Sequence, residues 1–131
     1  MSAEVYRYLL DDLKVMAEGF AMNVRPPFSF FLTGDIGAGK TTFSQFFIRS
    51  ILIDKNQDIT SPTFNIVHIY ETIKGPLWHV DLYRIKRLEE IDDLGLFEAM
   101  SENVCLIEWP DLIKEEGARY AHEEIHLDPI S

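Results

Sequence analysis

The chain contains a single cysteine, Cys105, among its 131 residues, so it cannot form an internal disulfide. A lone cysteine is typical of a protein kept in a reducing compartment. Long hydrophobic runs are missing too. The first residues have no apolar core of signal-peptide length, and the later apolar runs are far too short to span a bilayer. We therefore expect a soluble, cytoplasmic protein that is not exported and has no membrane contact.

Basic residues are scarce, with 12 Lys and Arg against 22 Asp and Glu and a net charge of −10. The imbalance lies in the second part of the chain. Residues 1–53 carry five basic and five acidic side chains, whereas residues 54–131 carry seven and seventeen. Such a surface repels phosphate backbones, so we expect any contact with nucleic acid to be indirect, through a partner protein. Acidity that only aids solubility is an equally good interpretation.

Helix and strand patterns alternate along the chain. Apolar residues at helical spacing predict helices from Leu9 to about Val24 and from Thr41 to Leu52, and the apolar run Phe28–Thr33 between them predicts a buried strand. The later patterns predict two hairpin strands, an acidic helix with a break near Gly95, a buried strand and a final strand, at Asn65–Glu71 and Leu77–Arg84, Leu88–Met100, Val104–Ile107 and Glu123–Leu127. The order is that of one α/β domain over residues 1–131, a sheet flanked by helices with an inserted antiparallel hairpin.

A glycine-rich segment lies between the strand and the second helix. Gly34-x-x-x-x-Gly39-Lys40-Thr41 matches the Walker A pattern of P-loop proteins. Glycines let the backbone N–H groups curl around phosphates, the lysine reaches the β- and γ-phosphates, and the threonine hydroxyl is a ligand for Mg²⁺. The predicted nucleotide-binding residues here are Asp35, Gly37, Ala38, Gly39, Lys40, Thr41 and Thr42. The sequence has no Asn-Lys-x-Asp motif for guanine, so ATP with Mg²⁺ is favoured over GTP.

A P-loop site needs an acidic residue at the end of another strand to hold Mg²⁺ or its water shell. Glu108 follows the unbroken apolar run Val104–Ile107, as a core parallel strand requires, and is the better candidate. Asp81 follows the less uniformly apolar run Leu77–Val80. Two interpretations of Asp81 are equally good: it contacts the metal, a water of the metal or the γ-phosphate, or it is a solvated carboxylate at the end of a strand. We predict Lys40, Asp81 and Glu108 as catalytic, and Thr41 and Glu108 as metal ligands.

Four segments together resemble the bacterial TsaE family, also called YjeE, from about residue 8 to residue 127. They are the glycine loop through Phe43, Ser61-Pro62-Thr63-Phe64 with the residues to Tyr70, His79-Val80-Asp81-Leu82-Tyr83-Arg84, and Ile107-Glu108-Trp109-Pro110. The glycine loop alone is shared by many families, whereas the combination is specific. The chain ends early after Leu127, so the resemblance carries no contact from a longer C-terminal tail.

The resemblance implies a P-loop α/β fold and a weak ATPase that works with the TsaB and TsaD proteins in tRNA threonylcarbamoyladenosine synthesis. By position it implies that Thr63 lies in a segment that senses the γ-phosphate, and that Asp81 sits close to the attacking water or the metal. It also implies that Trp109 lies near the nucleotide. Transfer of threonylcarbamoyl to tRNA is the work of the partners, so tRNA contact is again indirect.

Other signals compete with this interpretation. A small-molecule kinase could use the same loop, although we find no lid segment, and nucleotide binding could serve only to shape a docking surface. The segment His122–His126 matches the zinc-protease pattern His-Glu-x-x-His, but a third ligand would have to come from elsewhere. His68 and His79 on the hairpin favour packing over catalysis, and Arg84 favours pairing with acidic groups over a role as an arginine finger.

Overall fold

The computed structural model describes residues 4–8, 12–35, 37, 39–62 and 66–129. In this part of the chain six strands form one sheet, in the order β1–β6–β2–β5–β4–β3. The strands are β1 (Glu4–Tyr8), β2 (Phe28–Thr33), β3 (Val67–Thr72), β4 (Gly75–Asp81), β5 (Val104–Glu108) and β6 (His122–Pro129). Neighbouring strands are parallel except for β3, which pairs antiparallel with β4 at one edge.

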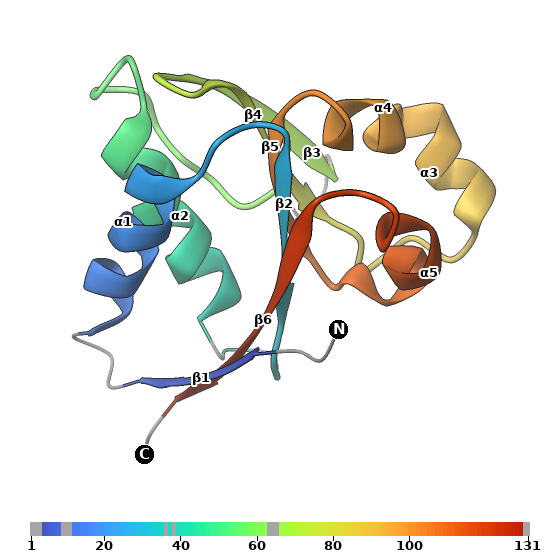
Figure 1. Cartoon of the computed structure of the whole chain (residues 1–131), viewed down its shortest axis with the longest axis horizontal. Helices are drawn as coiled ribbons and strands as arrows, with labels where there is room; N and C mark the ends of the chain where they lie inside the picture. Colours follow the sequence, from blue (N-terminus) through green and yellow to red (C-terminus); the bar gives the residue numbers. More distant parts are fainter. Residues whose placement is uncertain (1–3, 9–11, 36, 38, 63–65, 130–131) are drawn as a thin grey trace.

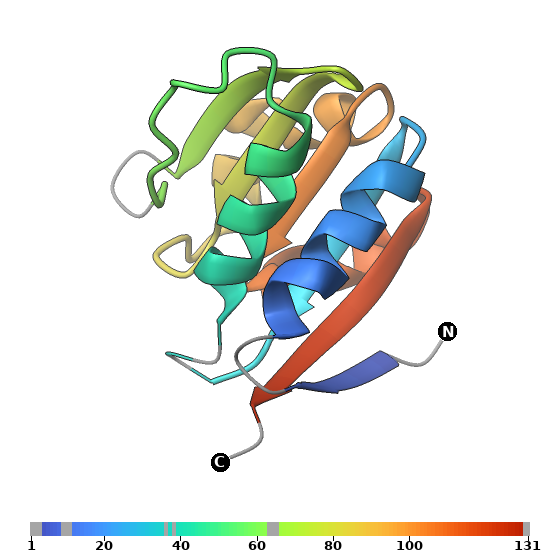
Figure 2. The same ribbon diagram turned by 90° about the vertical axis from the view of Figure 1, so that its left-hand side faces the viewer.

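Helices cover both faces of the sheet (Figures 1 and 2). One face is covered by α1 (Leu13–Asn23) and α2 (Lys40–Ile51). The other is covered by α3 (Leu88–Leu94), α4 (Leu96–Met100), the 3₁₀ helix η2 (Pro110–Ile113) and α5 (Lys114–Gly117). The end of α3 lies at Gly95, whose φ of 75° is the left-handed conformation that stops a helix. The result is a three-layer α/β/α arrangement.

Alternate residues of the central strands supply two separate cores, because successive side chains of a strand point to opposite faces. Phe30 and Leu32 of β2 pack under α1 and α2, where Phe30 meets Phe47 edge to face at 5.3 Å between ring centroids. Phe31, between them, belongs to the core under α3 and α4. Burying each of these large apolar side chains stabilises the fold by about 1.5–3 kcal/mol. Both faces of β2 are therefore anchored close to the glycine loop that follows it.

Most sequence predictions of elements are confirmed, with differences at the ends. The strand Phe28–Thr33 has the predicted bounds, and α2 begins and ends one residue earlier than predicted. The hairpin strands lie at Val67–Thr72 and Gly75–Asp81, so the second ends before the predicted Arg84. The hairpin is also part of the main sheet, since β4 pairs in parallel with β5.

Strand β1 and the short helices η2 and α5 were not predicted. A five-residue edge strand has little periodicity of its own, and β1 exists because its backbone pairs with β6, far away in sequence. In the predicted helix from Leu9, the described part of α1 begins at Leu13. Within the described parts of the chain, every helix falls short of the length and apolar character that a membrane crossing requires.

The topology brings three strand ends together. Strands β2, β5 and β4 are consecutive neighbours and run in the same direction, so their carboxyl ends lie at one edge of the sheet. The glycine loop follows β2, Glu108 is the last residue of β5, and Asp81 is the last residue of β4. Ligands of open α/β sheets bind at this kind of edge. The predicted site residues from three distant segments are thereby gathered in one place.

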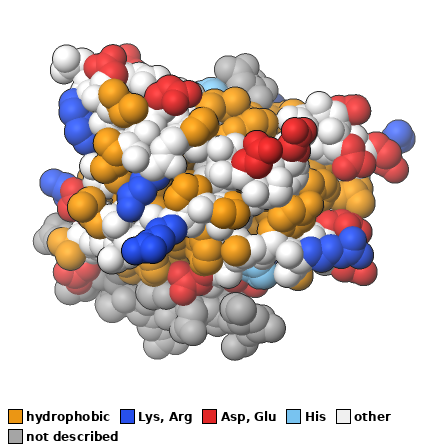
Figure 3. All heavy atoms as spheres, turned by 45° about the horizontal axis from the view of Figure 1, so that its top comes forward, with side chains coloured by type: hydrophobic (Ala, Val, Ile, Leu, Met, Phe, Trp, Pro, Cys, Tyr) orange, Lys and Arg blue, Asp and Glu red, His pale blue; other side chains and the backbone are white. Residues whose placement is uncertain are grey.

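The surface carries apolar side chains as well as acidic ones. Ile69, Ile73 and Val15 are exposed by 51%, 66% and 71%. On the face that appears when the top of Figure 1 is tilted forward, acidic side chains are spread among hydrophobic ones and are not gathered in one patch (Figure 3). Exposed apolar residues of this kind are common on globular proteins.

Candidate nucleotide-binding site

The loop between β2 and α2 has the backbone of a phosphate cradle. Gly34, Gly37 and Gly39 have φ angles of 140°, 84° and 101°, a region that side-chain-bearing residues rarely adopt. Gly39 is the N-cap of α2, and its carbonyl accepts the first helical hydrogen bond, from the N–H of Phe43 at 2.7 Å. The first N–H groups of an α-helix have no partner within the helix, so the start of α2 and its dipole favour an anion in the loop.

Lys40 is the first residue of α2, and its side chain folds back over the loop. It is only 5% exposed. Its ammonium donates hydrogen bonds to the carbonyls of Gly34 at 2.7 Å and Asp35 at 3.0 Å, and it lies 4.2 Å from the ring centroid of Trp109. Burial lowers the pKa of Lys40, against the opposing attraction of Glu108, Asp81 and Asp35. The hydrogen-bond acceptors of the ammonium are neutral carbonyls, so a phosphate bound in the loop would bring a negative charge into direct contact with it.

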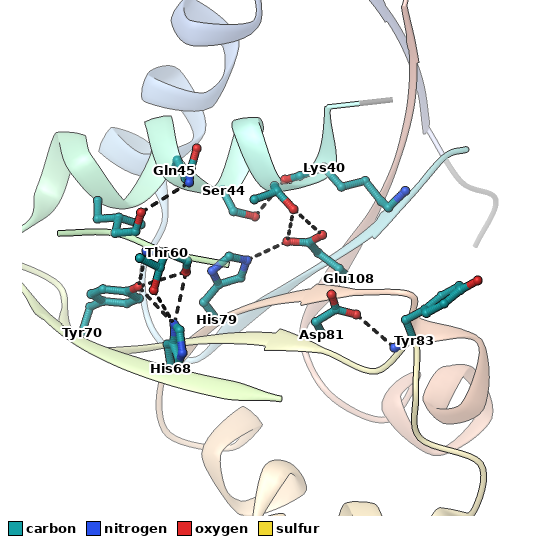
Figure 4. A network of polar contacts seen from close by, with 12 residues as sticks. Lys40, Ser44, Gln45, Thr60, His68, Tyr70, His79, Asp81, Tyr83 and Glu108 are labelled. Atoms are coloured by element: carbon teal, nitrogen blue, oxygen red, sulfur yellow. Dashed lines mark hydrogen bonds and ion pairs between the residues drawn. The ribbon is translucent and has the colours of Figure 1, made fainter. Parts of the chain in front are cut away.

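Glu108 is held by side chains on both of its oxygens (Figure 4). Thr41 donates its hydroxyl to Oε1 at 3.0 Å, and Nε2 of His79 lies 2.7 Å from Oε2. Glu108 is 2% exposed and the His79 side chain is fully buried. A carboxylate this far from water needs such partners, because an unpaired buried charge costs several kcal/mol. Glu108 and Thr41, which the sequence predicts as metal ligands, are thus in direct contact.

Asp81 lies directly opposite Glu108 in the register of β4 and β5. Its carboxylate accepts a hydrogen bond from the backbone N–H of Tyr83 at 3.0 Å. Burial raises the pKa of Asp81, that hydrogen bond works against the shift, and the nearby charge of Glu108 adds to it. Two carboxylates therefore share this edge of the sheet in unequal surroundings.

These residues line one cavity of about 240 Å³. Its lining comprises Gly37, Gly39, Lys40, Thr41, Thr42, Ser61, Asp81, Glu108 and Trp109. Most of the predicted site residues are thus brought together. Ser61 lines the cavity but was not predicted as a site residue, although it begins the Ser-Pro-Thr-Phe segment used for the resemblance. Asp35 is exposed, and it contributes its main-chain carbonyl to Lys40.

Some predictions cannot be placed. Ala38 and Thr63 lie outside the described residues.

Two further residues of the predictions are described. Arg84 is exposed on the segment that follows β4. Trp109 has a positive φ of 56°, packs against Tyr83 at 4.9 Å between ring centroids, and lines the same cavity as Lys40 and Thr41.

The two hairpin histidines differ. His68 is near the sheet edge, where its Nδ1 lies 3.1 Å from the carbonyl of Thr60, in a group that includes the hydroxyl of Tyr70. His79 is buried, as packing requires, but it also contacts Glu108, which sequence reasoning missed. A signal was present. Residues two apart on a strand share a face, so His79 had to lie on the same side of the sheet as Asp81.

The zinc-protease pattern falls on strand β6. His122 stacks on Phe31 at 4.7 Å between ring centroids, and the Nδ1 of His126 lies 2.9 Å from the hydroxyl of Thr33. Four residues along a strand separate the two histidines by about 13 Å, which is too far for one zinc ion.

The oxygen atoms at the site suit Mg²⁺. The hydroxyl of Thr41 and the carboxylates of Glu108 and Asp81 are the hard oxygen donors that this ion prefers, usually together with substrate phosphates. Among the described residues, no group of three or more His, Cys, Asp or Glu side chains is arranged to hold a metal ion.

Comparisons with known proteins agree on one family. The family model for the threonylcarbamoyl adenosine biosynthesis protein TsaE matches residues 9–130. A protein of Rickettsia prowazekii named tRNA threonylcarbamoyladenosine biosynthesis protein TsaE is 47% identical over 103 residues, covering 79% of this chain and 71% of that protein. The protein of the same name from Bacillus subtilis is 39% identical, covering 81% of this chain and 65% of its own length.

A solved structure is similar as well. The crystal structure of Bacillus subtilis YdiB superposes with a TM-score of 0.58 at 33% sequence identity, covering 81% of this chain. This chain spans 63% of the length of that protein.

Proposed function

The chain belongs to the TsaE family, and from that premise we propose that it is a weak Mg²⁺-dependent ATPase required for N6-threonylcarbamoyladenosine modification of tRNA. It acts with the TsaB and TsaD proteins, which hold the tRNA. The observation that carries the ATPase proposal is the single cavity that joins the glycine loop, Lys40, Thr41, Asp81 and Glu108. The names of the relatives support the role in tRNA modification.

The chain's own residues supply binding and orientation. Phosphate oxygens would replace the carbonyls of Gly34 and Asp35 as acceptors for the Lys40 ammonium, and the amides at the start of α2 would bind the same phosphates. Thr41 donates its proton to Glu108, so the lone pairs of its oxygen are available to Mg²⁺. Thr41 and Glu108 would hold the ion, which neutralises charge on the transferred phosphate when bound.

Asp81 is suited to act on water. Its pKa is raised, which brings it closer to the working pH and makes the carboxylate a better proton acceptor than an ordinary aspartate. It sits in the cavity beside Glu108 and accepts a hydrogen bond from Tyr83, which orients it. No strong general base is obvious among the described residues of the site, so turnover by the isolated protein should be slow.

Steady-state phosphate release from Mg²⁺-ATP, with and without the TsaB–TsaD pair, tests the proposal. Lys40→Ala serves as the blank, and Lys14→Ala, which removes an exposed lysine of α1, is the matched control. We expect a slow rate in the isolated protein that rises when the pair is added and is lost only in Lys40→Ala. A rate that does not respond to the pair would contradict the partner assignment and leave only the P-loop ATPase.

The same assay separates the rival functions. A small-molecule kinase would release little phosphate to water and would transfer it to an added acceptor. A nucleotide-gated docking module would not need hydrolysis, so Glu108→Ala would support tRNA modification as long as it still binds ATP and the partners. Normal binding with loss of modification in that variant would exclude the docking-only function.

A further inference from the structure

The contact between His79 and Glu108 is the shortest side-chain contact to that carboxylate in the described site. It joins Nε2 to Oε2 at 2.7 Å, and neither side chain reaches solvent to any extent, with 0% and 2% exposed. A contact this short, between two groups removed from water, has a fixed geometry, because neither group has water as an alternative partner.

The other nitrogen of the ring indicates which tautomer is present. Nδ1 of His79 is buried and meets no hydrogen-bond partner among the described residues. A proton on Nδ1 would therefore be a buried donor without an acceptor, which is costly. The neutral imidazole with its proton on Nε2 leaves only an unpaired lone pair on Nδ1, and it donates that proton to Glu108.

The strands place this donor behind the carboxylate. Glu108 lies opposite Asp81 in the register, and His79 is two residues before Asp81 on the same face of β4. His79 thus meets Glu108 from the interior, and Thr41 meets it from α2, at the cavity. The Thr41 hydroxyl reaches both carboxylate oxygens, at 3.0 and 3.4 Å, and His79 meets Oε2 (Figure 4). Partners on both oxygens restrict rotation of the carboxylate plane.

We propose that His79 is a positioning residue, which donates from Nε2 to Glu108 and so fixes the carboxylate in the orientation that meets Thr41 and the metal. The effect of His79 on metal binding rests on the proposed function, because it assumes that Glu108 holds Mg²⁺. The orientation of Glu108 itself is a property of the protein without nucleotide or metal, and can be tested separately.

Three substitutions at position 79 distinguish donation from packing. In His79→Gln the amide N–H reaches about as far as Nε2 and restores the donor. In His79→Asn the amide lies near the position of Nδ1 and falls short of Glu108. In His79→Leu the buried volume is largely kept and no donor is present. Gln and Asn have the same chemistry, so they remain an informative pair even if the leucine variant does not fold.

The first measurement is calorimetric binding of ADP with Mg²⁺ and with EDTA, giving the factor by which Mg²⁺ tightens binding. We expect His79→Asn and His79→Leu to reduce that factor by about 10- to 100-fold, as loss of a partner behind a metal ligand does, with binding in EDTA changed less than about twofold. His79→Gln should restore most of it. Equal losses with and without Mg²⁺, or a glutamine variant no better than asparagine, would overturn the proposal.

The second measurement needs no metal or nucleotide. A double-mutant cycle of His79→Asn and Glu108→Gln on the unfolding equilibrium, together with the ¹⁵N NMR signals of the imidazole, reports on the hydrogen bond itself. We expect a coupling of about tenfold in the unfolding constant, and a ring protonated on Nε2 only. Absence of coupling, or a proton on Nδ1, would overturn the proposal. If Mg²⁺ fails to tighten ADP binding to the wild type, the proposed function is wrong, and this cycle still decides the role of His79.

Discussion

The ends of strands β5 and β4 carry the same kind of group in opposite surroundings. Glu108, at the end of β5, is almost fully buried and has a side-chain partner on each oxygen, from Thr41 and His79. Asp81, directly opposite at the end of β4, is partly exposed and accepts a hydrogen bond from the backbone of Tyr83. One carboxylate is held in place, and the other has more access to the cavity.

Neighbouring carboxylates in unequal environments usually divide the work between them. A rigid, buried carboxylate suits the holding of a metal ion, since the ion needs a fixed ligand geometry. A partly exposed carboxylate with a raised pKa suits contact with water and protons. We therefore propose that Glu108 holds the metal and that Asp81 acts on the attacking water, and the following predictions test this division.

The largest effect is expected at the end of β5. Glu108→Gln keeps the shape but removes the charge, so it should lower Mg²⁺-dependent ATP hydrolysis by about 10²–10³-fold, the scale of a lost electrostatic group in an active site. Binding of ATP in EDTA should change little, because Lys40 and the loop amides remain. Phosphate release and calorimetry measure the two effects. Glu102→Gln, an exposed change just before β5, should match the wild type in both.

A smaller effect is expected at the end of β4. Asp81→Asn should lower hydrolysis by about 10–100-fold, since it removes the proton acceptor while the other site residues remain. The Mg²⁺ dependence of ADP binding should stay within about threefold of the wild type in Asp81→Asn, whereas Glu108→Gln, which removes the charge of the proposed metal ligand, should lose most of it. The same two assays compare the variants directly. If Asp81→Asn abolished the effect of Mg²⁺ on binding and Glu108→Gln did not, the assignment of the two carboxylates would have to be reversed.

Trp109 joins the two strand ends. It follows Glu108, its ring contacts Tyr83 beyond Asp81, and it lies under the ammonium of Lys40. Trp109→Ala should cost about 1 kcal/mol of unfolding free energy in urea titrations, from the lost cation–π contact and ring packing. Trp109→Phe keeps an aromatic face and should lose less than half of that. Equal losses in the two variants would show that the ring face does not interact with Lys40.

The smallest effect concerns pH and stability. Because burial raises the pKa of Asp81, the native state binds its proton more tightly than the unfolded chain does. Below the unfolded pKa the group is neutral in both states and costs nothing, and stability is lost as the pH rises through the native value. Asp81→Asn should therefore be more stable than the wild type at neutral pH, by no more than about 0.5 kcal/mol, because Asp81 is partly exposed and solvent screens its charge.

The advantage of Asp81→Asn should fade towards acidic pH, where Asp81 is protonated in the wild type. Thermal unfolding of the nucleotide-free proteins measures the difference in stability between the two. The scan runs from about pH 3 to about pH 8, which extends from the titration range of carboxyl groups to neutral pH. An asparagine variant that is less stable at every pH would show that the Asp81 carboxylate is favourably paired in the native state.

Much of the site could be read from local sequence. The Walker A spacing, the apolar strand before it and the helix after it predicted β2, the loop and α2 to within one residue. These features depend on neighbours in the chain, because backbone curvature at glycine and apolar periodicity are local properties. The apolar run before Glu108 also marked the end of β5.

Other features depend on contacts between distant segments. The hydrogen bond between His79 and Glu108 spans 29 positions in the chain. Ser61 lines the cavity although it lies in a stretch for which the sequence predicted neither a helix nor a strand. Strand β1 needs β6, at the other end of the chain, as its hydrogen-bond partner. No local pattern encodes these pairings.

The sequence by itself determined the phosphate loop, the two acidic strand ends and the family to which the chain belongs, because each is carried by a short run of residues. Only the tertiary structure decided which carboxylate is buried, which one keeps access to the cavity, and that His79 lies behind Glu108. The reason is physical. Burial, hydrogen-bond partners and pKa shifts arise from the order of strands in the sheet, and that order brings together residues that are far apart in the chain.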